Sequence, residues 1–458
     1  MMDTATAART VHGRMLGRNV QFARVATDTR TLAPGDLFVA LKGEHFDGHD
    51  FVAAAFERGA AAALVAADRA GALAGNLVAV PDSLAALGVL AAHWRARFAI
   101  PVIVIVGSNG KTTVKEMLAA ILREHHGASR VLATEGNLNN AIGLPLTLLR
   151  LRHEHAAAAI ELGMNHPGET AELAAIAQPT VAVINNAQRE HQEFMRSVAD
   201  VAAEHATLLS ALRDGGTAVL NADDPSVGVW RDVASGRADV RVTEFAVDRE
   251  EAGVRARTMS ADGAIVLATP AGEAAVRLAA PGRHNVANAC AAAAAALAIG
   301  IPLAAVVRGL EAFRPVAGRL AARRATSGAA VIDDTYNANP DSVRAAIDVL
   351  GAAPSPRWLV LGDMGEVGEN GPAFHREAGR HARDARIDRL LTTGTLAAES
   401  AAAFGPGAEH FASVAALAAH VADHARAGTT VLVKGSRFMR MERVVAALCG
   451  ASPGQGAH

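Results

Sequence analysis

A run of glycine, hydroxyl and lysine side chains behind an apolar segment has the types and spacing of a phosphate-binding loop. The residues Val102–Val106 predict a buried strand, and directly after it come Gly107, Ser108, Asn109, Gly110, Lys111, Thr112 and Thr113. Glycines let backbone N–H groups close around phosphate oxygens, and the following helix directs its positive end at them. Lys111 is suited to neutralising β- and γ-phosphate charge, and Thr112 to ligating Mg²⁺. The usual loop has one more glycine, at the position that Ile105 occupies here. The shorter form still predicts a bound nucleotide, because it directly follows a run of five β-branched residues.

A carboxylate and an imidazole stand where two further strands are expected to end. Glu161 lies near the end of the predicted strand 157–162, and the segment Glu190-His191-Gln192-Glu193 follows the predicted strand 181–185. Ligands bind beyond the carboxyl ends of strands in open parallel sheets. Glu161, His191 and Thr112, together with phosphate oxygens, therefore form a candidate Mg²⁺ shell. Spacing alone leaves a second interpretation open, in which Glu161 pairs with an arginine and His191 only caps a helix.

Two asparagine-rich segments also invite a functional and a structural interpretation. The segment 134–140 contains Asn137, Asn139 and Asn140, which form either a binding loop or a set of Asx turns. Asn285 and Asn288 enter an alanine-rich helix. There they either cap the helix or contact a base, and capping is the default expectation.

Two more polar segments follow predicted strands in the last third of the chain. The first, 333–340, reads Asp-Asp-Thr-Tyr-Asn-Ala-Asn-Pro and contains the only tyrosine. A strand-to-helix loop this polar is more often functional than structural. The second, 434–437, offers Lys434 and Arg437 to a carboxylate or phosphate, with a solvated loop as the alternative.

The elements that must position these residues fall into three α/β blocks, and we expect domains of residues 1–99, 100–314 and 315–458. Pro101 and Pro315 mark the joints, because proline discourages helix in the residue before it. Strand and helix patterns alternate in the second and third blocks, which predicts parallel sheets with helices on both faces. The fold class is therefore α/β, with a small N-terminal domain, a central P-loop parallel-sheet domain and a C-terminal Rossmann-like doubly wound domain.

The expected strands can be given by their ranges. They lie at 36–41, 62–66 and 77–80 in the first block, at 102–106, 157–162, 181–185 and 218–221 in the second, and at 329–333, 358–362, 390–393 and 431–435 in the third. The segment 240–278 reads as a small side sheet, and the tail 451–458 is expected to fray.

Composition excludes several classes of protein. The chain has 458 residues and a formal net charge of −2 with no basic block, so we expect neither nucleic acid nor an anionic membrane surface as a partner. Cys290 and Cys449 are far apart in apolar contexts, which favours buried thiols over a disulfide or metal site. No secretory signal and no membrane-spanning stretch are visible. We therefore expect a cytoplasmic protein without membrane insertion.

Taken together, these motifs resemble one family along nearly the whole chain. In order, they are Thr27-Asp28-Thr29-Arg30, the short G-x-x-G-K-T-T loop, G-N-x-N-N at 136–140, E-L-G-M-N at 161–165, G-R-H-N-V-x-N at 282–288, D-D-T-Y-N-A-N-P at 333–340, G-D-M-x-E at 362–366 and K-G-S-R at 434–437. As a set they are similar to the Mur ligases of peptidoglycan synthesis, although each piece alone is unspecific.

The resemblance implies an ATP- and Mg²⁺-dependent amide ligase. Its expected substrates are UDP-N-acetylmuramoyl-tripeptide and D-alanyl-D-alanine. The γ-phosphoryl group of ATP goes to the tripeptide carboxylate, and the amine of the dipeptide attacks the acyl phosphate. Phosphorylation turns an inert carboxylate oxygen into a leaving group, so the protein mainly positions the reactants and supplies cations.

The resemblance also assigns roles by position. Lys111, Glu161 and His191 are the expected catalytic residues, and Thr112, Glu161 and His191 are the expected metal ligands. The remaining ATP contacts are Asn285 and Asn288 at the adenine and Arg319, Asp334 and Asn337 from the third domain. The expected substrate contacts are Thr27, Asp28 and Arg30 for the UDP end, Asn137, Asn139 and Asn140 in the binding loop, and Lys434 and Arg437 for the dipeptide carboxylate.

One departure from the family pattern concerns a second metal. Most Mur ligases carry a carbamylated lysine on the helix after the metal histidine, and here that position is His205. No lysine occurs between Lys115 and Lys434, so no carbamate forms in this segment. Either His205 or water takes the role, or phosphate and solvent hold the second metal. The structural alternative is that His205 is a helix-surface residue without a role. A milder departure is Ser108, where many relatives have threonine.

Rival functions can be distinguished from an amide ligase by their sequence motifs or by a simple assay. Sibling ligases that add a diamino acid resemble Y-A-H-T-P-D where this chain has Tyr336–Asp341, and folate polyglutamylating enzymes share only the architecture. A P-loop switch or motor would hydrolyse ATP without an acceptor. Three domains around one reaction centre also predict hinge closure. The third tripeptide residue, the domain arrangement and the oligomeric state stay open, with the absence of heptads favouring a monomer.

Overall fold

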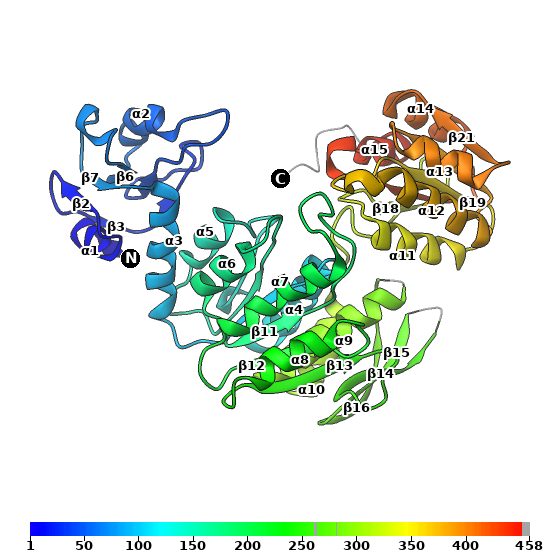
Figure 1. The fold of residues 1–458 in the computed structure, drawn as a ribbon, viewed down its shortest axis with the longest axis horizontal. Helices are drawn as coiled ribbons and strands as arrows, with labels where there is room; N and C mark the ends of the chain where they lie inside the picture. Colours follow the sequence, from blue (N-terminus) through cyan, green and yellow to red (C-terminus); the bar gives the residue numbers. More distant parts are fainter. Residues whose placement is uncertain (261–262, 281, 451–458) are drawn as a thin grey trace.

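The computed structural model describes residues 1–260, 263–280 and 282–450, and the tail expected to fray lies outside them. Three α/β units follow one another, with the central unit between the other two (Figure 1). The expected three-part α/β fold is confirmed.

The N-terminal unit has a sheet in the order β2-β7-β6-β5-β4, parallel except for β2. Its elements are β1 (Met2–Asp3), α1 (Thr4–Thr10), β2 (Arg14–Leu16), β3 (Gln21–Phe22), β4 (Val25–Ala26), β5 (Leu37–Val39), α2 (Val52–Glu57), β6 (Ala62–Ala66), β7 (Leu77–Val80) and α3 (Ser83–Ala96). Asp82 caps α3 by accepting from the backbone N–H groups of Leu84 and Ala85. This long helix packs on both the first sheet and the central unit, where Trp94 Nε1 donates to the Leu151 carbonyl at 3.0 Å.

The described strands of the central unit form one nine-stranded sheet, in the order β16-β15-β14-β13-β12-β11-β8-β10-β9. Its elements are β8 (Val102–Val106), α4 (Lys111–His126), β9 (Val131–Ala133), α5 (Gly143–Leu148), β10 (Ala157–Glu161), α6 (Glu169–Ala177), β11 (Val181–Ile184), α7 (Val198–Ser210), β12 (Thr217–Asn221), α8 (Val227–Ser235), β13 (Arg241–Ala246), β14 (Val254–Met259), β15 (Ala264–Thr269), β16 (Gly272–Arg277), α9 (Arg283–Ala298) and α10 (Leu303–Ala312). The expected separate side sheet is therefore wrong, because β13 pairs with β12 in parallel and carries β14–β16 as an extension of the main sheet.

Helices cover both faces of the central sheet, as the continuous apolar run of β8 predicts. Val102, Val104 and Val106 pack with α3, α5, α6 and α7, whereas Ile103 and Ile105 pack with α4, α9 and α10. The alanines 289 and 291–296 of α9 are fully buried. Small side chains let this helix lie close to α4 and the sheet.

The C-terminal unit is a doubly wound sheet in the order β17-β18-β22-β19-β20-β21, with only β17 antiparallel among the described strands. Its elements are β17 (Ala321–Arg324), β18 (Ala330–Asp334), α11 (Pro340–Gly351), β19 (Arg357–Leu361), α12 (Gly371–Asp384), β20 (Arg389–Thr393), α13 (Ala397–Phe404), β21 (Ala408–Phe411), α14 (Val414–His424), β22 (Thr430–Lys434) and α15 (Glu442–Cys449). Asn339 and Ser342 form a reciprocal capping box at the start of α11, with Pro340 as its first residue.

Two smaller expectations concern cysteines and membranes. Cys290 is buried in α9, but Cys449 is partly exposed, and both thiols are free. Within the described residues, the structure has no helix of the length and apolarity needed to cross a bilayer.

Candidate active site

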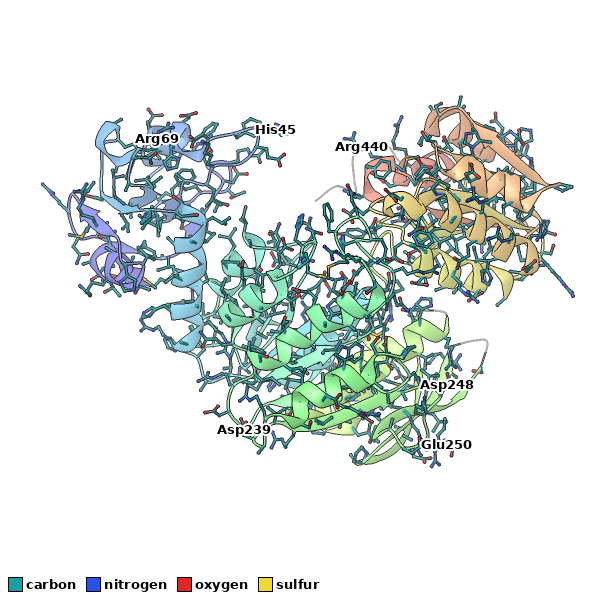
Figure 2. All side chains as sticks on the ribbon, viewed as in Figure 1. His45, Arg69, Asp239, Asp248, Glu250 and Arg440 are labelled. Carbon is teal, nitrogen blue, oxygen red and sulfur yellow. The ribbon has the colours of Figure 1, made fainter. Side chains whose placement is uncertain are left out.

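Most of the predicted site residues of the central and C-terminal units line one cleft of about 920 Å³. The P-loop and the ends of β10 and β11 form one wall, and the segment after β18 together with the end of β22 forms the other. The size is that of a pocket for a nucleotide-sized ligand. Asp248, which Figure 2 labels near the edge of the central unit, lies in this lining and pairs with Arg283.

The P-loop has a backbone shape that only glycine adopts easily. Gly110 is the N-cap of α4, with φ 83° and ψ −5°. A Cβ atom there would clash with Asn288 Oδ1 and lie 2.7 Å from Asn185 Nδ2. Lys111 Nζ donates to the carbonyls of Gly107 at 2.5 Å and Ser108 at 3.4 Å. The lysine expected to meet phosphate is therefore folded back on its own loop.

Glu161 lies beside the P-loop and is held by neutral donors. Its Oε2 accepts from Thr112 Oγ1 at 2.7 Å, and its Oε1 accepts from Asn139 Nδ2 at 2.7 Å. The alternative that Glu161 pairs with an arginine is wrong for the described residues, in which it has no ion pair of that kind. Two predicted metal ligands, Thr112 and Glu161, thus stand together with oxygen atoms of the type that Mg²⁺ prefers.

His191 faces a different carboxylate. Its Nδ1 lies 2.6 Å from Glu366 Oε2 of the C-terminal unit, without the alignment of a hydrogen bond. This contact is the main cause that holds the pKa of Glu366 below its usual range. The backbone of His191 is in the left-handed region, with φ 48°, and the residue that caps the next helix, α7, is Ser197. The helix-cap alternative for His191 is therefore wrong.

Glu190 and His205 form a buried pair next to this histidine. His205 is 1% exposed, so the alternative that it lies on the helix surface is wrong. Its Nε2 lies 3.2 Å from Glu190 Oε1, and Lys111 Nζ lies 3.5 Å from Glu190 Oε2. Burial raises the pKa of Glu190, but the charge of Lys111 and the imidazoles of His205 and His191 outweigh burial and hold it well below its usual range.

The asparagine segments divide between structure and site. Asn137, Asn139 and Asn140 all line the cleft, and Asn140 Oδ1 also accepts from the backbone N–H groups of Ile142 and Gly143, as the turn interpretation predicts. Asn288 accepts from Asn185 Nδ2 at 2.9 Å and donates to Asn285 Oδ1 at 3.2 Å.

The default expectation of helix capping by these two asparagines is wrong. Gly282 is the N-cap of α9, and both residues lie after it within the helix. Asn288 packs against Gly110 of the P-loop, and Asn285 accepts a hydrogen bond from Asn288.

On the opposite wall, Lys434 is already paired. Its Nζ donates to Asp334 Oδ2 at 2.6 Å and to the Asn337 carbonyl at 2.9 Å. Arg319 stacks over Tyr336 at 4.0 Å from the ring centroid. Arg437 is 58% exposed and is not among the cleft residues.

The expected UDP contacts lie elsewhere. Asp28 and Arg30 form an exposed ion pair at 2.6 Å in the N-terminal unit, where Arg30 is the main cause that lowers the pKa of Asp28. Neither they nor Thr27 line the cleft, which the first block reaches through Leu84 of α3.

Sequence reasoning missed Arg189 and the contacts that join the two walls. Arg189 makes bidentate contacts with Asp341 and Glu377 of the C-terminal unit, the shortest at 2.6 and 2.8 Å. Asn109 of the P-loop exchanges hydrogen bonds with Asn339 at 3.0 and 3.3 Å. The position of Arg189 beside Glu190 and His191 was the one available signal, but its partners lie far along the chain.

A ready-made metal cage is absent from the described residues, in which no three His, Cys, Asp or Glu side chains converge on one point. Mg²⁺ in nucleotide sites is usually held by one or two carboxylates together with phosphates and water. The Thr112–Glu161 oxygen pair and the buried Glu190 carboxylate fit that requirement.

The fold and the cleft define a P-loop protein of three α/β units whose site lies between the second and third. Family models match in the same order: the Mur ligase family catalytic domain at residues 21–125, the Mur ligase middle domain at 105–296 and the Mur ligase glutamate ligase domain at 318–437. The UDP-N-acetylmuramoyl-tripeptide--D-alanyl-D-alanine ligase of Escherichia coli (strain K12) is 41% identical over 442 residues, which cover 96% of each chain.

Solved structures agree over nearly the same length. MurF from Acinetobacter baumannii matches with a TM-score of 0.88 at 34% identity, covering 98% of each chain. MurF from Thermotoga maritima in complex with ADP matches with a TM-score of 0.80 at 26% identity, covering 93% of this chain and 96% of that one. The chain belongs to the Mur ligase family.

Proposed function

We propose that this protein is an ATP-dependent, ADP-forming ligase that joins D-alanyl-D-alanine to UDP-N-acetylmuramoyl-tripeptide in peptidoglycan precursor synthesis. The observation that carries the proposal is the cleft in which Lys111, Thr112 and Glu161 face Asp334 and Lys434. Its full-length relatives of the same family bear the name of this activity.

The chemistry assigned to the first wall is phosphoryl transfer from ATP to the terminal carboxylate of the tripeptide. Lys111 leaves the Gly107 carbonyl and pairs with the β- and γ-phosphates, and Gly110 lets the loop backbone approach them. Thr112, Glu161 and His191 are the proposed ligands for Mg²⁺, which when bound would neutralise phosphate charge. Oriented reactants and fixed cations are the main contributions such a transfer needs.

The second wall is assigned to the nucleotide and the acceptor. Arg319, Asp334 and Asn337 close over ATP, while Asn285 and Asn288 border the adenine. Lys434 and Arg437 are the proposed partners of the dipeptide carboxylate. For Lys434 this requires that Asp334 share the ammonium group it now holds at 2.6 Å. Thr27, Asp28 and Arg30 hold the UDP end, and we propose domains of residues 1–99, 100–314 and 315–458 for these three tasks.

The test measures the release of phosphate from ATP with one candidate acceptor at a time. The purified protein receives ATP, Mg²⁺ and UDP-N-acetylmuramoyl-tripeptide, and then D-alanyl-D-alanine, diaminopimelate or glutamate. We expect release only with the dipeptide. Release without any acceptor would instead identify a nucleotide-driven switch, and release with diaminopimelate would identify a sibling ligase. We also propose that the protein acts in the cytoplasm and works as a monomer.

A further inference from the structure

Glu190 is a buried carboxylate that the proposed reaction has not yet used. It is 5% exposed and lines the cleft beside the P-loop. Its Oε1 finds no hydrogen-bond donor with acceptable geometry among the described residues. A buried carboxylate needs a positive charge or donors close by, so the surroundings of Glu190 decide what it does.

Three nitrogen atoms surround the carboxylate. His205 Nε2 lies 3.2 Å from Oε1, while Lys111 Nζ and His191 Nε2 lie 3.5 and 3.8 Å from Oε2. Of these three residue types, only lysine is cationic throughout the neutral pH range. His205 is buried on α7 and lies against Oε1, the carboxylate oxygen that Lys111 does not face.

Nucleotide binding removes the permanent charge from this arrangement. Phosphate oxygens draw the Lys111 ammonium group to themselves, because their charge is larger than that of one carboxylate. Glu190 then stands at the phosphate site as an anion without its cation. A divalent cation that arrives with the nucleotide restores the balance, and a carboxylate oxygen is the ligand that Mg²⁺ prefers.

We propose that Glu190 is an anionic ligand of a divalent cation that binds together with the nucleotide, and that His205 positions it. The inference rests on the proposed function for the presence of ATP and Mg²⁺. It also accounts for the missing lysine at position 205: the buried pair supplies a carboxylate from the chain itself, where a carbamylated lysine would supply one from bicarbonate.

The competing role for Glu190 is that of a structural counter-ion for Lys111. A counter-ion would change nucleotide affinity without changing the affinity of the cation in the nucleotide complex. The two roles therefore separate when the cation is measured directly.

The experiment titrates Mn²⁺ into the full-length protein saturated with ADP and follows the free ion by electron paramagnetic resonance. We expect Glu190→Gln to weaken Mn²⁺ binding by about tenfold or more. His205→Gln should weaken it less and shift the spectrum of the bound ion. Glu193→Gln, an exposed residue of the same segment, is the matched control and should bind Mn²⁺ as the wild type does.

A second variant guards against misfolding of Glu190→Gln. Glu190→Asp keeps the charge and shortens the side chain, so we expect a folded protein with weakened Mn²⁺ binding. Affinity within twofold of the wild type in both Glu190 variants would overturn the proposal. Wild-type protein that binds Mn²⁺ and ADP but lacks acceptor-dependent phosphate release would contradict the proposed ligase function instead, and the titration would still decide the role of Glu190.

Discussion

The P-loop glycine at position 110 offers a substitution whose cost follows from the structure. Gly110→Ala places a Cβ atom on a residue with φ 83° and ψ −5°. An L-residue in this left-handed region loses about 1–2 kcal/mol. The new atom also clashes with Asn288 Oδ1, so the buried hydrogen bond between Asn185 and Asn288 must break or the loop must move.

The second contribution is the larger one. Leaving a buried amide without its partner costs about 1–3 kcal/mol. The protein escapes this cost by shifting the loop, and the nucleotide must then force the loop back. The cost therefore appears as lost affinity, and about 1–3 kcal/mol corresponds to roughly fivefold to 150-fold in the dissociation constant of ADP.

Gly168 is the matched control. It is the N-cap of α6 with φ 93° and ψ −20°, and its Cβ atom would meet nothing within 4 Å. Gly168→Ala therefore carries the same backbone strain without the clash, outside the cleft. Isothermal titration with ADP should show Gly110→Ala weakened within the stated range and Gly168→Ala within about twofold of the wild type. Equal ADP affinity in the two variants would refute the steric account of the loop.

Three further predictions test the cleft from other sides. Lys111→Ala should reduce dipeptide coupling by about a hundredfold or more, and coupling at the wild-type rate would contradict the phosphate role of this lysine. Added bicarbonate should leave the coupling rate unchanged, since α7 has no lysine to carbamylate; clear activation would show that a carbamate forms elsewhere. Arg189→Gln should increase the radius of gyration of the nucleotide-free protein in solution scattering, because Arg189 joins the two walls through Asp341 and Glu377. The hydrogen bond from Arg189 is the main cause that holds the pKa of Glu377 below its ordinary value of 4.5, so this contact is complete above pH 4.5 and is lost as the pH falls through the lowered pKa. Scattering should show the wild type opening in that acidic range and Arg189→Gln already open at neutral pH, whereas identical curves for the two proteins would show that the contact does not hold the walls together.

The sequence by itself determined the local parts of this protein. The β-branched run of β8 and the glycines and lysine behind it specify a strand, a turn and a helix through near-neighbour sterics, and the structure has each of them in place. The apolar runs and the glycine, proline and polar residues that bound them also indicated most parallel strands to within a residue or two. The parallel strands β4, β9 and β21 were missed. β4 and β9 have only two and three residues, which are too few to show a period, and the middle of β21 is polar.

Tertiary structure alone decided which polar groups became partners. Asn285 and Asn288 were expected to cap a helix. Instead Asn288 packs against the P-loop and bonds to Asn285 and to Asn185, which the fold brings to it across about a hundred residues. The capping preference is a local effect of about 1 kcal/mol, and a buried amide network overrides it.

The same physical reason separates the predicted site from the observed one. Sequence spacing places Glu161 and His191 after two strands that follow one another in the chain, but it does not say which donors each will meet. Packing assigned Thr112 and Asn139 to Glu161, Glu366 to His191, and the buried His205 to Glu190. Residue types along the chain set what chemistry is available. Because electrostatic and hydrogen-bond energies depend on distances between atoms far apart in the chain, only the folded structure decides where that chemistry is placed.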